Sequence, residues 1–197
     1  MKKLVVAIFL VGFVSLMVGC GIQAIPQAQN SVEASMAEVT NQYKRRSDLI
    51  PNLVNTVKGF AKQEETVLTE VTNARARATS INLDPKNLKA QELESFQKAQ
   101  GELSRSLGRL LVVAENYPQL KSDANFRDLQ AQLEGTENRI TVARNRYINA
   151  IREFNNLVTV PPSSWTNALF YHFEKKPQFA LEGAEATEVQ KAPEVKF

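Results

Sequence analysis

Cys20 is the residue whose type and position most clearly predict a chemical reaction. It is the only cysteine of the 197-residue sequence, so it cannot form a disulfide within the chain, and it directly follows Gly19. Residues 16–20, Leu-Met-Val-Gly-Cys, resemble the bacterial lipobox, in which a diacylglyceryl group joins the cysteine thiol before a peptidase cuts in front of that cysteine. Met17 stands where the lipobox usually has Leu, Val or Ile. We expect Cys20 to be a lipid attachment site whose palmitate-type acyl chains anchor the protein to a membrane.

The residues before Cys20 have the order of a secretory signal peptide. Lys2 and Lys3 form a short basic head, and the apolar run 4–18 follows them. A membrane-spanning helix needs about 20 apolar residues, and this run of 15 is shorter. We expect residues 1–19 to be removed as a signal peptide. The alternative is that the run stays in place as a short uncleaved anchor.

The residue after the cysteine bears on the destination of an exported lipoprotein. In a bacterium with two membranes, Asp at this position is associated with retention at the inner membrane, and this sequence has Gly21 instead. We therefore expect the periplasmic face of the outer membrane. In a host with one membrane, the same chemistry predicts the outer face of that membrane.

The other residue types give little support for an enzyme or a metal site. His172 is the single histidine, and the sequence has no Glu-x-x-His, His-Glu-x-x-His, Cys-x-x-Cys or Gly-x-Ser-x-Gly motif. Carboxylate pairs such as Glu134 and Glu137 are typical of a solvated helix face. Gly135 lies within a predicted helix at a cost of about 1 kcal/mol relative to Ala, which indicates that another backbone or side chain approaches it closely. We expect no catalytic residue, no metal and no cofactor.

The charge balance argues against nucleic acid as a partner. The sequence has 24 Lys and Arg residues against 21 Asp and Glu residues, and removal of Lys2 and Lys3 with the signal would leave a net charge of about +1. Proteins that bind nucleic acid usually carry a strong basic excess, because neutralised phosphates supply most of the non-specific affinity. A membrane and a protein of the cell envelope are the partners that we expect.

Two groups of residues are candidates for contact with a protein partner. Basic residues cluster in short stretches. They either lie on a solvated face and form salt bridges inside the fold, or they bind an anionic partner. An aromatic cluster near the C-terminal end either packs on one end of the helical domain or forms a docking patch. The candidate partner-facing residues are Arg45, Arg46, Arg144, Trp165 and Phe170.

Amphipathic periodicity predicts that four long helices position these residues. Apolar residues recur at helical spacing over residues 28–46, 50–80, 85–117 and 126–157. The last of these segments keeps a seven-residue repeat throughout, as in a coiled coil. We expect an all-α fold, namely an antiparallel four-helix bundle whose long helices are similar in length.

The junction near residue 50 allows two arrangements. Pro51 disfavours helical geometry at Ile50, and Ser47 is a good N-cap residue, so a reversal of the chain between residues 46 and 50 is favoured. The apolar register also runs unbroken through Tyr43, Arg46 and Ile50. One long helix kinked at Pro51 is therefore the alternative.

Turn and cap residues predict the other boundaries. Asp84, which proline follows, is expected to cap the third helix, and Pro118 is expected to end it. We expect residues 20–29 to be a lipid-anchored tether and residues 30–179 to be one helical domain with a short aromatic C-terminal segment. Residues 180–197 have little to bury and are expected to be a disordered tail.

Three blocks of this sequence resemble the LemA family. They are residues 42–59 (QYKRRSDLIPNLVNTVKG), residues 108–118 (GRLLVVAENYP) and residues 125–147, which contain LEGTENRI. The blocks occur in the order and at the spacing of the family. The resemblance covers about residues 30–179.

The resemblance implies an antiparallel bundle of four long helices at the outer side of a bacterial membrane. Members of the family commonly enter the bundle from an N-terminal spanning helix, whereas this sequence has a lipobox. The family has no agreed biochemical activity, and its members are sometimes encoded near TPM-domain envelope proteins or membrane proteases. We expect a non-enzymatic scaffold or adaptor for an envelope protein. The alternatives are self-assembly into a homo-oligomer and an enzyme of an unrecognised kind.

Overall fold

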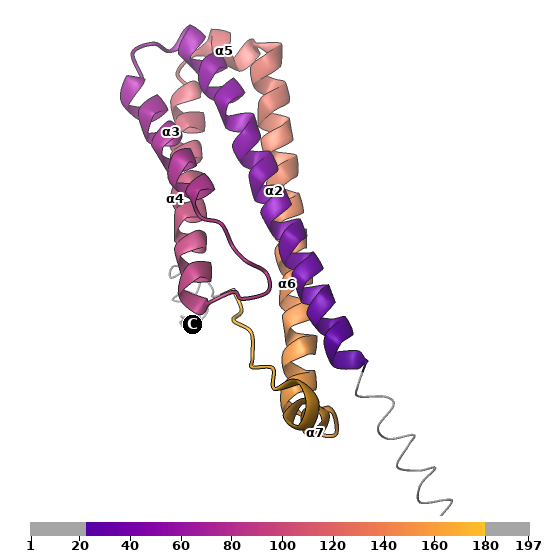
Figure 1. The fold of residues 1–197 in the computed structure, drawn as a ribbon. Helices are drawn as coiled ribbons and strands as arrows, with labels where there is room; N and C mark the ends of the chain where they lie inside the picture. The colour runs from indigo at the N-terminus through magenta and orange to yellow at the C-terminus, as the bar shows by residue number, and fades with distance from the viewer. Residues whose placement is uncertain (1–22, 180–197) are drawn as a thin grey trace, which may run out of the picture.

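The structure, a computed structural model, describes residues 23–179, and all regular secondary structure within this range is helical (Figure 1). The elements are α2 (Ala24–Phe60), α3 (Glu65–Ser80), α4 (Ala90–Ala114), α5 (Pro118–Ser122), α6 (Ala124–Thr159), α7 (Ser163–Thr166) and the π-helical turn η1 (Asn167–Tyr171). The all-α prediction is confirmed. The predicted signal peptide 1–19, the predicted lipid site Cys20 and the predicted tail 180–197 lie outside the described residues. None of the helices between residues 23 and 179 has both the length and the hydropathy to cross a bilayer.

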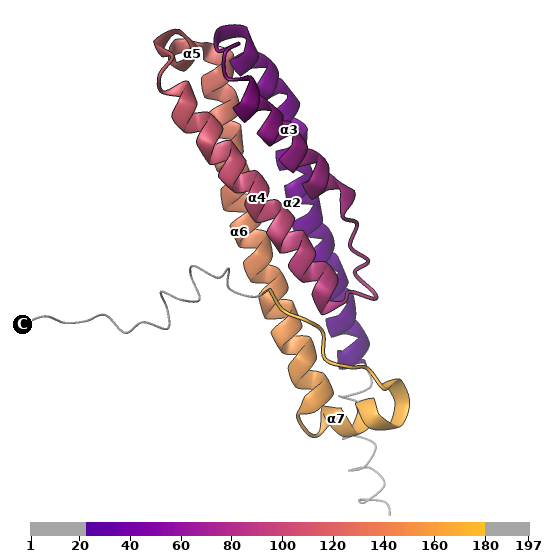
Figure 2. The same cartoon turned by 90° about the vertical axis from the view of Figure 1, so that its left-hand side faces the viewer.

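Two long helices form the axis of the molecule. α2 has 37 residues and α6 has 36, and they lie side by side, while α3 and α4 lie side by side next to their upper parts (Figures 1 and 2). α3 has only 16 residues, so the prediction that the long helices are similar in length is wrong. The lower parts of α2 and α6 are instead covered by the segment that follows η1.

α2 corrects two predicted boundaries. It begins at Ala24, so residues 24–29, which the sequence predicted to be tether, are helical. Pro26 lies in its first turn, where the missing amide N–H of proline costs no helical hydrogen bond. α2 also continues through Pro51 to Phe60, and the predicted reversal between residues 46 and 50 is wrong.

Pro51 is accommodated because another helix replaces the hydrogen bond that it removes. Proline cannot donate to the carbonyl four residues before it, which here belongs to Ser47. The side-chain Nε of Arg75 on α3 donates to that carbonyl at 2.8 Å. The chain reverses only at residues 61–64, where Glu64 accepts a 3.0 Å hydrogen bond from the Tyr117 hydroxyl. This hydrogen bond raises the pKa of the Tyr117 phenol.

The start of α4 also differs from the prediction. Asp84 does not cap a helix; its carboxylate accepts from the backbone N–H of Lys86 at 3.0 Å and from the Asn87 side chain at 3.1 Å. The hydrogen bond from Lys86 lowers the pKa of Asp84. Asp84 therefore closes a turn in the connection, and α4 begins only at Ala90. α4 ends at Ala114, and Pro118 begins α5 instead of ending α4.

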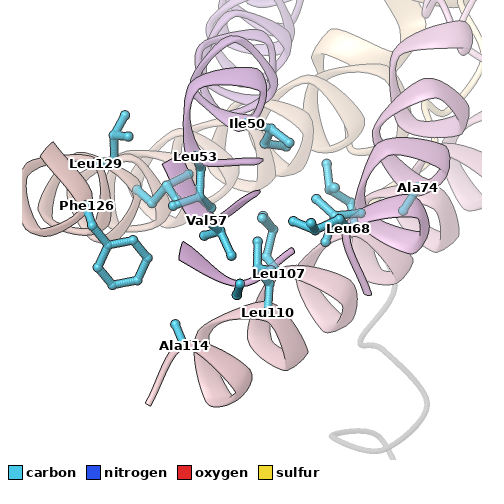
Figure 3. Close-up of a cluster of buried hydrophobic side chains, with 14 of the residues drawn as sticks. Ile50, Leu53, Val57, Leu68, Ala74, Leu107, Leu110, Ala114, Phe126 and Leu129 are labelled. Atoms are coloured by element: carbon cyan, nitrogen blue, oxygen red, sulfur yellow. The ribbon is translucent and has the colours of Figure 1, made fainter. Parts of the chain in front are cut away.

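The buried apolar side chains form two separate clusters along the long axis. The upper cluster draws on α2, α3, α4 and α6, and Figure 3 shows side chains from these helices meeting around Leu53, Val57 and Leu110. The lower cluster joins the first half of α2 to the second half of α6 and includes Leu93 and Phe96 of α4. Ile25 and Phe154 in it are both fully buried. Between the two clusters, α2 contributes polar residues to the interior.

The segment after η1 completes the lower cluster. The Phe173 ring packs edge-on against Phe154, with ring centroids 5.9 Å apart, and Phe179 packs likewise against Tyr147 at 5.1 Å. In Figures 1 and 2 this segment runs back along α6 from the lower end of the molecule. It covers the part of α2 and α6 that the shorter helices α3 and α4 do not cover.

Candidate interaction surfaces and the buried polar layer

Arg46 is the most deeply buried charged residue in the described part of the chain, with 1% of its surface exposed. Its Nη1 donates to Glu137 Oε1 at 2.7 Å and to Ser104 Oγ at 2.9 Å, and its Nη2 donates to Gln100 Oε1 at 2.6 Å. The guanidinium also lies over the Tyr43 ring, 5.0 Å from its centroid. The prediction that Arg46 faces a partner is wrong, because its place in the stripe of buried residues on α2 directs it inward.

The groups around Arg46 form a polar layer between the two apolar clusters. Arg46, on α2, binds residues of α4 and α6, and the Gln100 side chain donates onward to the Ala78 carbonyl of α3 at 3.3 Å. All four long helices are thus joined by hydrogen bonds at one level. A buried polar group without partners costs about 1–3 kcal/mol, so this layer favours the helix register that satisfies it.

A pocket of about 290 Å³ opens beside the polar layer. Tyr43, Ser47 and Gln100 contribute to its wall, together with one residue of each charge, Lys44 and Asp48. The remaining lining is mostly apolar side chains and neutral hydroxyl or amide groups. Nothing in this set pairs a nucleophile with a base, and we assign the pocket no reaction.

A second candidate surface is the α2–α6 face, defined by two shallow grooves between α2 and α6. One groove is lined by Glu38, Gln42, Asn138, Arg139, Val142 and Arg146, and the other by Asn52, Asn55, Thr56, Asn125, Asp128, Leu129 and Gln132. Gly135 lies on α6 between the two grooves, three residues after Gln132 and four before Arg139, which places it on the same side of the helix. Val142, which lines the first groove, is 50% exposed.

Gly135 leaves open space on the α2–α6 face. A Cβ atom added at this position would have no heavy atom within 4 Å. The close neighbour predicted for Gly135 is therefore not found among the described residues. Arg45 is exposed and lies three residues after Gln42, so it borders the same face.

A third candidate surface is the aromatic end, residues 160–173, which includes α7 and η1 at the lower end of the molecule (Figures 1 and 2). Trp165, Leu169 and Phe170 are 69%, 70% and 57% exposed. Tyr171 and Phe173 instead pack against the lower apolar cluster. Packing thus accounts for Tyr171 and Phe173, whereas Trp165, Leu169 and Phe170 are exposed, as the docking alternative requires.

Two asparagines fix the backbone at the aromatic end and just after it. The buried Asn167 side chain donates to the Phe173 carbonyl at 2.9 Å and accepts from the Phe173 amide at 3.0 Å. Asn155 on α6 makes the same pair of bonds with Lys176, at 3.1 and 2.9 Å. The bonds of Asn167 close the chain around His172, whose φ of 58° lies in the left-handed region, and those of Asn155 tie the following segment to α6.

The other predicted site residues are separated in space. Arg144 is half-buried, with its guanidinium carbon 5.0 Å from the centroid of the Phe179 ring, and so lies beneath the C-terminal segment. Arg45 borders the α2–α6 face, whereas Trp165 and Phe170 belong to the aromatic end. Leu169 and Val142 were missed by the sequence prediction. Within residues 23–179, no three His, Cys, Asp or Glu side chains are grouped as metal ligands would be.

The family model described as LemA family matches residues 35–197. No curated protein matches the chain.

Proposed function

The chain belongs to the LemA family, and on that premise we propose that it is a non-enzymatic scaffold or adaptor of the bacterial cell envelope. Lipid on Cys20 holds it at the periplasmic face of the outer membrane, or at the outer face of the cell membrane in a host with one membrane. We interpret α2, α3, α4 and α6 as an antiparallel bundle, because successive helices of this set run in opposite directions (Figure 1). A partner protein binds along the α2–α6 face.

The open space at Gly135 is the observation that carries this proposal. A glycine inside a helix costs about 1 kcal/mol relative to alanine, and here no neighbour within the described chain requires it. A helix from another protein can approach the backbone most closely where a Cβ is missing. The exposed Val142 two turns further along α6 offers an apolar contact on the same face.

The charges on this face indicate the chemistry of the partner. Three exposed arginines, Arg45, Arg139 and Arg146, stand there against one exposed acid, Asp128, whereas the half-buried Glu38 accepts a hydrogen bond from Gln42. Complementary charge favours association, and like charges facing each other oppose it. A second copy would bring this same predominantly basic surface against itself, so an acidic amphipathic helix of a different protein fits the face better.

Site-specific photocrosslinking in intact cells tests the proposal. A photoreactive amino acid replaces Val142 on the α2–α6 face, and a control variant carries it at Val112 of α4, which is 64% exposed. We expect Val142 to give one dominant adduct with a different envelope protein and Val112 to give none of that adduct. An adduct of two copies of this chain would support self-assembly instead, and equal patterns at the two positions would contradict both.

A further inference from the structure

The aromatic end holds the largest group of exposed apolar side chains in the described structure. Seven large hydrophobic residues are exposed between residues 23 and 179, and four of them lie within eleven consecutive positions: Val160, Trp165, Leu169 and Phe170. Leu169 follows Trp165 by four residues and Phe170 follows it by five. In the π-helical turn η1 a spacing of five residues corresponds to one turn, so Phe170 lies on the same side as Trp165 and Leu169. Contiguous exposed apolar surface of this kind marks a site of interaction.

The same segment carries no full charge. Between Val160 and Phe173 the sequence has no Asp, Glu, Lys or Arg, although charged residues make up 23% of the whole chain. Charged residues return immediately afterwards as Glu174, Lys175 and Lys176. A protein partner would be compatible with scattered charges at the rim of its interface, whereas insertion among lipids makes every buried charge costly.

The exposed side chains are presented on a fixed backbone. Asn167 makes two hydrogen bonds to the Phe173 backbone, Asn155 makes two to the Lys176 backbone, and Phe173 packs on Phe154. Because these contacts hold the backbone on its inner side, the side chains of Trp165, Leu169 and Phe170 project outward. Preorganisation reduces the conformational entropy lost when such side chains are immobilised at an interface.

The aromatic end lies at the end of the molecule where α2 begins (Figures 1 and 2). Cys20 precedes Gln23, the N-cap of α2, by three residues, and three residues span about 10 Å at most. A lipid on Cys20 would therefore hold this end within reach of the bilayer surface.

We propose that the aromatic end docks on the lipid bilayer and inserts Trp165, Leu169 and Phe170 at the level of the headgroups. The proposal rests on the lipid anchor of the proposed function. The anchor fixes the distance from the membrane, and the inserted side chains fix the orientation, with the long helices standing away from the bilayer. Trp and Phe are the side chains that amphipathic membrane-surface segments use at this depth.

Trp165 is the only tryptophan of the sequence, so its fluorescence reports on this site without any label. The full gene is expressed with its signal, and the mature protein is reconstituted into vesicles of phosphatidylcholine and phosphatidylglycerol. In a parallel sample the phosphatidylcholine acyl chains are brominated near the headgroup, where bromine quenches nearby indole. We expect a shift of Trp165 emission to shorter wavelength and strong quenching by the brominated lipid.

Two variants show which side chains are responsible. Leu169→Ser combined with Phe170→Ser should abolish most of the quenching while circular dichroism shows an unchanged helical content. Phe60→Ser is the matched control, because Phe60 is also exposed but ends α2 at the opposite end of the molecule. It should leave the quenching as it is.

Three outcomes would overturn the docking proposal. Trp165 unquenched by brominated lipid and open to aqueous acrylamide would mean that the aromatic end faces water. Trp165 shielded from both quenchers would mean that a protein covers it. Full quenching in the double variant would mean that these side chains are not required. Intact mass of the same preparation reports the lipid separately, so a lipidated protein with unquenched Trp165 contradicts docking and leaves the anchor standing.

Discussion

The Nε of Arg75 on α3 lies 2.8 Å from the backbone carbonyl oxygen of Ser47 on α2 and donates a hydrogen bond to it. Within a regular helix this oxygen would accept from the amide of residue 51, which is proline and has none. Ser47 is buried, so a water molecule cannot easily donate the missing hydrogen bond to this oxygen. α3 therefore completes the hydrogen bonding of α2 at the position where Pro51 supplies no donor.

We predict that Arg75→Met lowers the free energy of unfolding by about 1–3 kcal/mol, because it leaves the buried Ser47 carbonyl without a donor. Denaturant titration followed by circular dichroism measures this change. Arg77→Met is the control, since Arg77 is exposed and its salt bridge with Glu102 lies on the surface. In a Pro51→Ala background the amide of residue 51 is restored, and Arg75→Met should then cost much less. Equal costs in the two backgrounds would contradict this role of Arg75.

A second prediction concerns the polar layer. Arg46→Ala removes the donor to the buried Gln100 side chain and the partner of the half-exposed Glu137, and it should lower the free energy of unfolding by about 2 kcal/mol. Arg45→Ala, one residue earlier on the exposed side of α2, should change it by less than about 0.5 kcal/mol. Similar midpoints for the two variants in a denaturant titration would show that Arg46 is not a structural arginine.

The register of α2 could be predicted from its sequence, but its boundaries could not. Tyr43, Arg46, Ile50 and Leu53 fall on one helical stripe, and all four are buried. That spacing alone could have placed Arg46 in the interior. The continuity of the helix through Pro51 depends on Arg75, which is 24 residues away in sequence and comes near only in the folded chain. A prediction from local helix propensity does not include a hydrogen-bond donor that is distant in the sequence.

The actual reversal did leave a signal in the sequence. Glu64 interrupts an otherwise apolar heptad stripe between Phe60 and Val67, and the chain turns at residues 61–64. At this junction the charged residue coincides with the break, whereas Pro51, whose missing hydrogen bond Arg75 replaces, does not. The connection after α3 shows the limit of such signals, because Asp84 was predicted to cap a helix but closes a turn, and the helix begins only at Ala90.

A third prediction tests the open space at Gly135. Gly135→Ala should raise the free energy of unfolding by roughly 1 kcal/mol, because alanine is the better helix former and its methyl group meets no neighbour within 4 Å. The same methyl group should reduce the crosslink from position 142 to the envelope partner. Gly108→Ala is the matched control, since Gly108 on α4 is equally free of neighbours. It should stabilise the fold to a similar extent and leave the crosslink unchanged.

A fourth prediction concerns alkaline pH. Burial raises the pKa of the Tyr147 phenol well above its ordinary value of 10.0. Above pH 10 the unfolded chain loses this proton while the folded chain keeps it, so the stability associated with Tyr147 is present below pH 10 and declines as the pH rises further. The decline approaches about 1.4 kcal/mol per pH unit. Tyr147→Phe should remove this part of the pH dependence, and parallel stability profiles for the two proteins above pH 10 would contradict it.

The candidate surfaces could be predicted from sequence only in part. Composition and position identified the aromatic cluster, but Asn155 and Asn167 decide which of its members face outward, through hydrogen bonds that close in three dimensions. Arg144 was predicted to face a partner, yet its guanidinium lies against the ring of Phe179 from the C-terminal segment. A periodicity argument treats each helix alone and does not account for a non-helical segment packed across it.

The lipid anchor at Cys20 underlies both the proposed function and the orientation at the membrane, and the intact mass of the protein purified from its native membrane tests it most directly. We predict a mature chain that begins at Cys20 and carries the added mass of two or three acyl chains. Cys20→Ser should accumulate as the full-length precursor, without incorporation of a palmitate analogue. A wild-type chain that still contains Lys2 and Lys3, with no added lipid mass, would contradict the anchor.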